Sequence, residues 1–255
     1  MAQLLHPSRF APKEAILAGS QLFAGISAPL VRAFAASSER LVLGRGDRVW
    51  TPGDPATHFS VVAYGTMKLQ RLRPESPVIL AFFNPGESVA DALVVARGKM
   101  PACAVAQSSV VELLRVPAEP VLAAAKRDPA LAEALHVAVS RQVRWLHTKI
   151  EVVTMGSVSE RIATFVLRHV EQLALPEARN EVELAFAPSR VELASMIEAR
   201  PETVTRALGK LARDGVLTVG KATIVVHDIR ALRALVPHEI TGESASSATD
   251  ATAVA

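Results

Sequence analysis

The stretch from Ser189 to Gly215 constrains the fold of this chain most, because it reads as two short helices joined by a tight turn. Ser189 and Glu192 stand three residues apart and match the capping box that starts a helix. Pro201 suits the first position of a second helix, and Gly215 suits a left-handed cap at its end. Two helices with so short a connection predict a helix-turn-helix.

The second helix of this pair is amphipathic. Its apolar residues recur four and three positions apart, and they are Val204, Leu208 and Leu211. Residues 216–219 and 222–227 then read as two short strands around Gly220 and Lys221. This ribbon predicts the wing of a winged helix-turn-helix.

The polar face of the second helix has side chains suited to the major groove of DNA. Arg206 can donate two hydrogen bonds to guanine, Glu202 can accept one from cytosine, and Thr205 can contact a thymine methyl group or a phosphate. Further residues are predicted to contact the DNA backbone: Ser189, Arg200, Thr203, Lys210 and Lys221. The alternative is an ordinary solvated face with a Glu202–Arg206 pair at i,i+4.

The charge of this region limits how it can bind DNA. Residues 156–240 contain 11 Lys and Arg and 11 Asp and Glu, so they carry no net charge. Non-specific affinity for the phosphate backbone should therefore be modest. We expect binding to depend on a dimer that spans two half-sites.

A long helix is predicted before this region. Asp128 is a plausible N-cap with Pro129 at the first helical position, and no Gly or Pro follows until Gly156. Apolar residues then follow a heptad spacing, and they are Val139, Val143, Leu146, Ile150 and Val153. We interpret this seam as a dimerisation face. The alternative is a helix that packs on its own domain.

The chain before residue 117 has the character of a small antiparallel barrel or roll. Segments 40–49, 59–63, 67–73, 78–83 and 102–116 read as strands, separated by turns rich in Gly and Pro. Residues 13–36 read as helical and are expected to lean on the roll. The predicted fold class is thus α+β: an N-terminal β-roll, a long dimerisation helix and a C-terminal winged helix-turn-helix.

Composition excludes several classes of protein. A single cysteine, Cys103, excludes a disulfide framework and any metal cluster held by several thiolates of one chain. No run of eighteen apolar residues and no secretory signal is visible, so we expect a cytoplasmic protein without membrane contact. A Gly-rich phosphate loop, metal-ligand spacing and a nucleophile arrangement are also missing, so we do not expect an enzyme.

The stretch Ala199–Leu208 resembles the recognition helix of the cyclic-AMP receptor protein/FNR (Crp/Fnr) family, whose core is Glu-Thr-Val-x-Arg. The resemblance spans roughly residues 20–236. It implies a cyclic-nucleotide-binding-like jelly roll and a homodimer that reads a palindromic promoter in double-stranded DNA and contacts RNA polymerase. Pro201, before the recognition Glu202, resembles the FNR and nitric-oxide-responsive branches, which implies a TTGAT-like half-site.

The effector pocket departs from the family pattern. The family's phosphate cassette places Gly-Glu first and Arg-Ser about ten residues later, whereas here Glu87 is followed by Pro101 and Ala102 at the Arg-Ser place. Pro and Ala offer no charge or hydroxyl to a cyclic phosphate, although Arg97 and Lys99 lie nearby. We expect a degenerate pocket that does not take cyclic AMP, with these residues: Glu87, Asp91, Met100, Pro101, Ala102, Leu146 and His147.

No cofactor is certain from the sequence. The four-cysteine cluster of FNR is excluded, while the segments 67–75 and 89–92 resemble the haem-associated, nitric-oxide-responsive branch. Haem-ligand candidates are His147, His58, Cys103 and Met100. An alternative function is therefore a haem-based sensor of nitric oxide or carbon monoxide, or a sensor that acts through protein partners.

The predicted division of the chain follows from these segments. It comprises an N-terminal extension (1–19), the sensor roll (20–126), the dimerisation helix (127–155), the winged helix-turn-helix (156–238) and a disordered tail (239–255).

Overall fold

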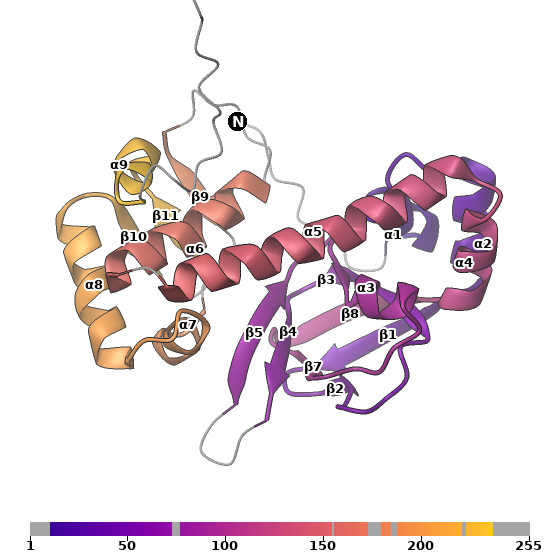
Figure 1. The fold of residues 1–255 in the computed structure, drawn as a ribbon, viewed down its shortest axis with the longest axis horizontal. Coiled ribbons are helices and arrows are strands. Elements are labelled where there is room, and N and C mark those ends of the chain that lie inside the picture. The colour runs from indigo at the N-terminus through magenta and orange to yellow at the C-terminus, as the bar shows by residue number, and fades with distance from the viewer. Residues whose placement is uncertain are drawn as a thin grey trace, which may run out of the picture. The chain divides into compact units, whose positions relative to one another are not determined.

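The structure of the protein, a computed structural model, describes residues 11–72, 77–154, 156–172, 180–184, 188–220 and 223–236 (Figure 1). By their contacts, residues form two units. The first comprises Met1–Val153 and Pro188–Pro201, and the second comprises Thr154–Ala187 and Glu202–Ala255. The α+β fold class predicted from the sequence is confirmed, with a β domain, a long helix and a C-terminal helix-turn-helix domain.

Two antiparallel four-stranded sheets form the roll of the first unit. The sheet orders are β1-β8-β3-β6 and β2-β7-β4-β5. The strands are β1 (Glu39–Gly44), β2 (Arg48–Trp50), β3 (His58–Tyr64), β4 (Met67–Arg71), β5 (Val78–Phe83), β6 (Ser88–Val89), β7 (Cys103–Ala106) and β8 (Val110–Pro117). Strands β2 and β5 are the two edge strands of their sheet among the described residues.

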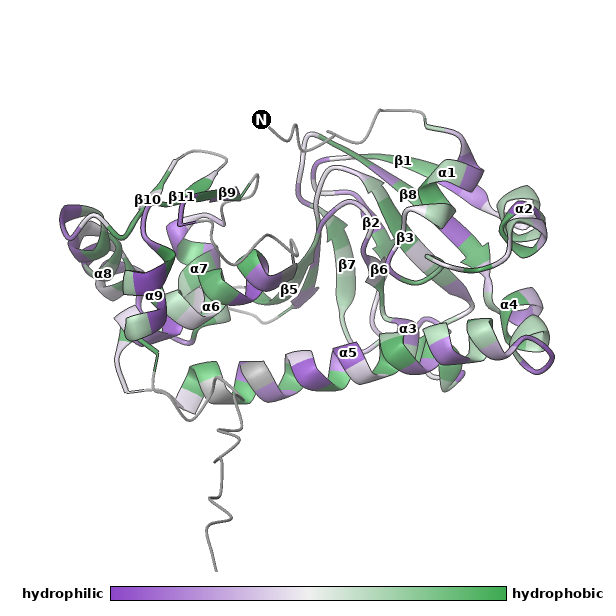
Figure 2. Cartoon of the chain, turned by 90° about the horizontal axis from the view of Figure 1, so that it is seen from above, coloured by the Kyte–Doolittle hydropathy of each residue, from purple (hydrophilic) through white to green (hydrophobic). Residues whose placement is uncertain are grey.

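Apolar side chains from both sheets and from the helices fill the core of the roll. Phe23, Phe59, Met67 and Leu113 are fully buried there, and Leu131 joins them from the long helix. Figure 2 shows the hydrophobic residues concentrated along the strands. Burial of these side chains is the main source of the stability of this unit.

Several helices belong to the first unit. They are α1 (Lys13–Ala18), α2 (Ala28–Ser37), α3 (Asp91–Val95), α4 (Ala118–Ala125), α5 (Pro129–Thr154, whose last residue falls in the second unit) and α7 (Arg190–Met196). Asp128 caps α5, since its Oδ1 accepts a hydrogen bond from the N–H of Leu131 at 2.9 Å. The N-cap predicted for the long helix is confirmed.

The sequence reading merged elements that the structure separates. The segment 13–36 is two helices, because the chain turns through residues 19–27, where Gly25 has a φ of 80°. The segment 40–49 is two strands, since the turn at Arg45 and Gly46 interrupts it. The segment 102–116 is likewise β7 and β8. Strand β6 and helices α3 and α4 were not foreseen.

Among the described turn residues of the roll, Gly65 is the one where space as well as conformation demands glycine. Its φ is +75°, and a Cβ at this position would lie 2.3 Å from the carbonyl oxygen of Val110. No larger residue fits there without a shift of the backbone. The close approach brings the β3–β4 turn against the start of β8.

The second unit contains the ribbon predicted as a wing and the second helix of the predicted helix-turn-helix. Its elements are α6 (Val158–Gln172), β9 (Val182–Leu184), α8 (Pro201–Arg213, whose first residue falls in the first unit), β10 (Leu217–Val219), β11 (Ile224–Val226) and α9 (Ile229–Ala234). The strands pair antiparallel in the order β10-β11-β9. Ser157 caps α6, because the N–H of Glu160 donates to Ser157 Oγ at 3.2 Å.

Among the described residues, none of the helices has the length and apolarity needed to cross a membrane.

Candidate nucleic-acid interface

Helix α8 buries one face and exposes the other, as its sequence predicts. Val204, Leu208 and Leu211 are buried, and Leu211 also accepts a hydrogen bond from Val216 that folds the chain back into the wing. The side chains of Glu202 and Arg206 are exposed. Within the described part of the chain these two side chains form no ion pair with each other. The Glu202–Arg206 ion pair of the alternative interpretation is therefore not formed in this structure.

The other residues predicted to contact DNA are exposed or half-buried where the structure describes them. Thr205, Arg200, Ser189 and Lys210 are exposed, and Thr203 is half-buried. Lys221 lies outside the described residues. The turn between β10 and β11 closes through a hydrogen bond from Gly220 N–H to the Thr223 carbonyl at 2.8 Å. A polar helix face beside a hairpin is the arrangement that winged readers of DNA use.

The capping box of α7 is present as predicted. The N–H of Glu192 donates to Ser189 Oγ at 3.2 Å, and the N–H of Ser189 donates to Glu192 Oε2 at 3.0 Å. Burial alone would raise the pKa of Glu192. The hydrogen bonds from Ser189 and the ammonium of Lys68 outweigh burial and hold the pKa of this carboxyl below its usual range.

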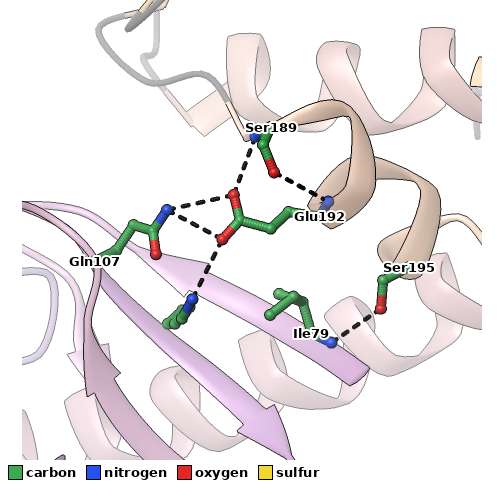
Figure 3. Close-up of polar contacts among 6 residues, drawn as sticks. Ile79, Gln107, Ser189, Glu192 and Ser195 are labelled. Carbon is green, nitrogen blue, oxygen red and sulfur yellow. Dashed lines mark hydrogen bonds and ion pairs between the residues drawn. The ribbon is translucent and has the colours of Figure 1, made fainter. Parts of the chain in front are cut away.

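Figure 3 shows contacts between α7 and the roll that no local sequence pattern indicates. Glu192 Oε1 accepts from Lys68 Nζ at 3.2 Å and from Gln107 Nε2 at 3.1 Å. The N–H of Ile79 on β5 donates to Ser195 Oγ at 3.1 Å. On the side of α5, Lys149 Nζ donates to the carbonyl of Met196. Helix α7 is thereby joined to β4, β5, the β7–β8 turn and α5.

The heptad residues of α5 are largely uncovered in the single chain. Val143 and Leu146 are each 48% exposed and Ile150 is 58% exposed, while Val139 and Val153 are half-buried. Val137, which the heptad reading did not include, is 39% exposed. An apolar face of this kind on a long helix is typical of a protein interface.

The effector segment from Gly86 to Ala92 contains two carboxyl groups, of which Asp91 is buried and Glu87 is half-buried. Glu87 Oε2 accepts from the N–H of Asn84 at 2.6 Å, and Asp91 Oδ2 accepts from the hydroxyl of Ser88. Among the described residues, Asp91 Oδ1 is buried without a hydrogen-bond partner. Burial raises the pKa of Glu87 to about 7 and that of Asp91 to about 6.

This segment is tied to α5 and to the turn after α1. The N–H of Ala92 donates to Gln142 Oε1 on α5 at 3.2 Å. The N–H of Gln21 donates to the carbonyl of Gly86 at 2.8 Å, and Arg141 of α5 donates to the side chain of Gln21. A rearrangement of the effector segment would therefore act directly on α5.

The other predicted effector residues do not supply a cation to this segment. Pro101 is exposed, whereas Met100 and Ala102 are buried. Arg97, one of the two nearby cations, pairs with Glu119 at 3.1 Å on the surface, and Lys99 is exposed. Leu146 and His147 are both exposed on α5.

The haem-ligand candidates lie on separate elements. His58 is on β3, where its Nδ1 lies 3.1 Å from Arg115, and burial together with that guanidinium lowers the pKa of His58. Cys103 is buried on β7. In the part of the chain that the structure describes, no three His, Cys, Asp or Glu side chains gather in a way that could hold a metal ion.

Comparison with known protein families matches both halves of this architecture. Residues 40–128 match the cyclic nucleotide-binding domain, and residues 160–235 match the Crp-like helix-turn-helix domain. The cyclic AMP receptor protein of Thermus thermophilus is 28% identical over 211 residues, which cover 82% of this chain and 94% of that protein. The global nitrogen regulator of Synechocystis is 28% identical, over 74% of this chain and 84% of that protein.

Solved structures share the fold. FixK2 of Bradyrhizobium japonicum superposes with a TM-score of 0.66 at 22% identity, over 78% of this chain and 98% of that one. A CRP/FNR-family transcriptional regulator of Thermus thermophilus has a TM-score of 0.58 at 25% identity, over 77% of this chain and 97% of that one.

Proposed function

We propose that this chain, a member of the Crp/Fnr family of non-enzymatic, DNA-binding transcription regulators, acts as a homodimer. The dimer reads a palindromic, TTGAT-like promoter site without cyclic AMP. Glu202, Thr205 and Arg206 read bases, and the promoter-bound dimer contacts RNA polymerase. The observation that carries the proposal is the exposed polar face of α8 above its buried stripe. The Pro201–Arg206 motif supports the choice of half-site.

The apolar face of α5 supports the dimer. Val143, Leu146 and Ile150 are exposed at heptad spacing, and their burial against a second copy would remove them from water. A dimer would also present two copies of α8 to half-sites about 34 Å apart, one turn of DNA. Two half-sites offset the weak non-specific attraction of a region with no net charge.

The carboxyl groups of Glu87 and Asp91 support independence from cyclic AMP. An anionic phosphate placed beside them would meet negative charge or protonated acids. Arg97, which lies nearby in the sequence, pairs with Glu119, and the positive charge of Arg141 on α5 already acts on these two carboxyl groups. We expect cyclic AMP to leave both the melting temperature and the affinity for DNA unchanged.

The test is DNA binding by the full-length protein to a TTGAT palindrome, a TGTGA palindrome and a scrambled duplex at about 0.15 M salt. Arg206→Ala should weaken binding to the preferred palindrome by about 1–3 kcal/mol and reduce its preference over the scrambled duplex. Arg213→Ala on the same helix is the control, because it removes the same charge from the end far from the base-reading turn.

Two results would contradict the proposal. Equal affinity of the wild-type protein for palindromes and scrambled DNA would show that it does not recognise a specific DNA sequence. The second result is a haem absorption band in the purified protein together with an affinity for DNA that changes when the haem binds gas. It would mean that the protein is a haem-based sensor and does not act independently of a ligand.

A further inference from the structure

Helix α7 is the first helix of the helix-turn-helix, yet its contacts assign it to the unit that holds the sensor roll. Three hydrogen-bonded groups of the roll contact it: Lys68 on β4, Ile79 on β5 and Gln107 in the turn before β8. We call these contacts of Glu192 and Ser195 with Lys68, Gln107 and Ile79 the α7 clasp (Figure 3).

The clasp engages the end of α7 that a DNA-bound helix-turn-helix would use. In that motif the first helix crosses the sugar-phosphate backbone, and the N-termini of helices contact phosphates. Here the first turn of α7 carries Glu192, whose carboxylate lies within 3.3 Å of Gln107 and 3.2 Å of Lys68. A duplex, whose major groove alone is about 12 Å wide, cannot approach that side of the turn while the roll is bound to it.

The clasp is well shielded from water. The side chains of Glu192 and Lys68 are only 16% and 18% exposed. Charge-assisted hydrogen bonds of this kind are stronger than those between neutral groups, and the shielding limits their screening by salt. The contact therefore has the strength to influence an equilibrium between docked and undocked α7.

The clasp is also connected to the effector segment. Lys149 of α5 donates a hydrogen bond to the carbonyl of Met196 at the end of α7, and Gln142 of α5 accepts one from the N–H of Ala92. These two residues are seven positions apart, so they lie on one side of α5 about 10 Å from each other. A shift of α5 would move both contacts together.

We propose that the α7 clasp is an autoinhibitory contact, which keeps α7 docked on the roll and away from DNA until it opens. This inference rests on the proposed function, since it assigns a regulation to the same DNA-binding helices. The apparent affinity for DNA then equals the intrinsic affinity multiplied by the fraction of molecules in which the clasp is open.

The test uses full-length variants that weaken the clasp without removing the cap. Glu192→Gln keeps a capping-box residue but loses the ion pair with Lys68, and Lys68→Ala removes the partner on the roll. Losing one such contact is expected to tighten binding to the palindrome about three- to tenfold. The control, Arg71→Ala, removes the same charge from an exposed position on β4.

The sign of the Lys68 result is diagnostic. Loss of a positive charge by itself weakens binding to DNA. A gain in affinity for DNA in Lys68→Ala, together with a loss or no change in Arg71→Ala, therefore supports an inhibitory clasp. The double variant Lys68→Ala with Glu192→Gln should gain less than the sum of the two single effects, because both remove one contact.

A second readout is independent of DNA. Hydrogen exchange of the Ile79 amide should accelerate in Lys68→Ala and Glu192→Gln but not in Arg71→Ala, because that N–H is protected by Ser195. Unchanged exchange overturns the clasp, and faster exchange with unchanged or weaker DNA binding overturns its inhibitory role. If no variant prefers the palindrome, the proposed function fails and the inhibitory role fails with it, while the exchange data still decide whether α7 is docked.

Discussion

Replacement of Glu87 by Gln should make the protein more stable above neutral pH. Burial raises the pKa of Glu87 from 4.5 to about 7. The folded protein therefore holds a proton that the unfolded chain releases, and the free energy of unfolding falls as pH rises from about 4.5 through 7. Gln removes this titration and still offers an oxygen to the N–H of Asn84.

The magnitude follows from the two pKa values. One pKa unit corresponds to about 1.4 kcal/mol, so the rise from 4.5 to about 7 is worth about 3 kcal/mol. We expect Glu87→Gln to exceed the wild-type free energy of unfolding by about 2–3 kcal/mol at pH 8 and to equal it near pH 4. Urea unfolding at a series of pH values measures the difference.

The control is Glu133→Gln, which removes an exposed carboxylate from α5 and should leave the pH profile unchanged. A wild-type profile that does not fall between pH 5 and 8, or a Glu87→Gln variant that is less stable at pH 8, would refute the assignment of a proton-retaining carboxyl group at Glu87. A residual slope in Glu87→Gln is expected, because burial also raises the pKa of Asp91 to about 6.

Three further predictions concern the fold and the dimer. Gly65→Ala should lower the free energy of unfolding, measured by urea unfolding, by at least about 2 kcal/mol. The reason is that the added Cβ would lie 2.3 Å from the Val110 carbonyl oxygen, at a φ of +75°. Gly156→Ala is the control and should change the free energy of unfolding little, because an added Cβ there meets nothing within 4 Å. Ser189→Ala should cost about 1 kcal/mol through loss of the cap on α7, measured by thermal or urea unfolding, and no loss would contradict the capping assignment. The double variant Leu146→Glu with Ile150→Glu should sediment as a monomer and lose its preference for palindromes, since each apolar side chain contributes up to about 1.5–3 kcal/mol when buried; a persistent dimer would move the interface elsewhere.

Local patterns predicted local structure well. The capping box at Ser189 and Glu192, proline at the start of α8 and the N-cap at Asp128 are each decided by a few neighbouring residues, and all are present. The buried stripe of α8 followed from the 3.6-residue period of a helix. The merged strands show the limit of this reasoning, because the hydrophobicity of residues 40–49 does not reveal the turn that divides them.

Contacts between distant residues were beyond such patterns. Glu192 reads as a capping residue and nothing else, yet its carboxylate also meets Lys68, which is 124 residues away in the chain, and Gln107, which is 85 residues away. Arg97 was placed near the effector segment by sequence distance, but it turns to Glu119. Only the packing of the roll decides these partners.

The position of β5 has a consequence for the solution behaviour of the protein. Its residues, Val78 to Phe83, are entirely apolar and uncharged, and it is one of the two edge strands of its sheet among the described residues. Such strands tend to pair with strands of other molecules and to aggregate. The backbone N–H of Ile79 on β5 donates a hydrogen bond to Ser195 of α7. Because this N–H cannot then pair with a strand of another molecule, α7 should also reduce self-association. Variants that release α7 should lose solubility before they lose their fold, and low protein concentration is the condition under which to study them.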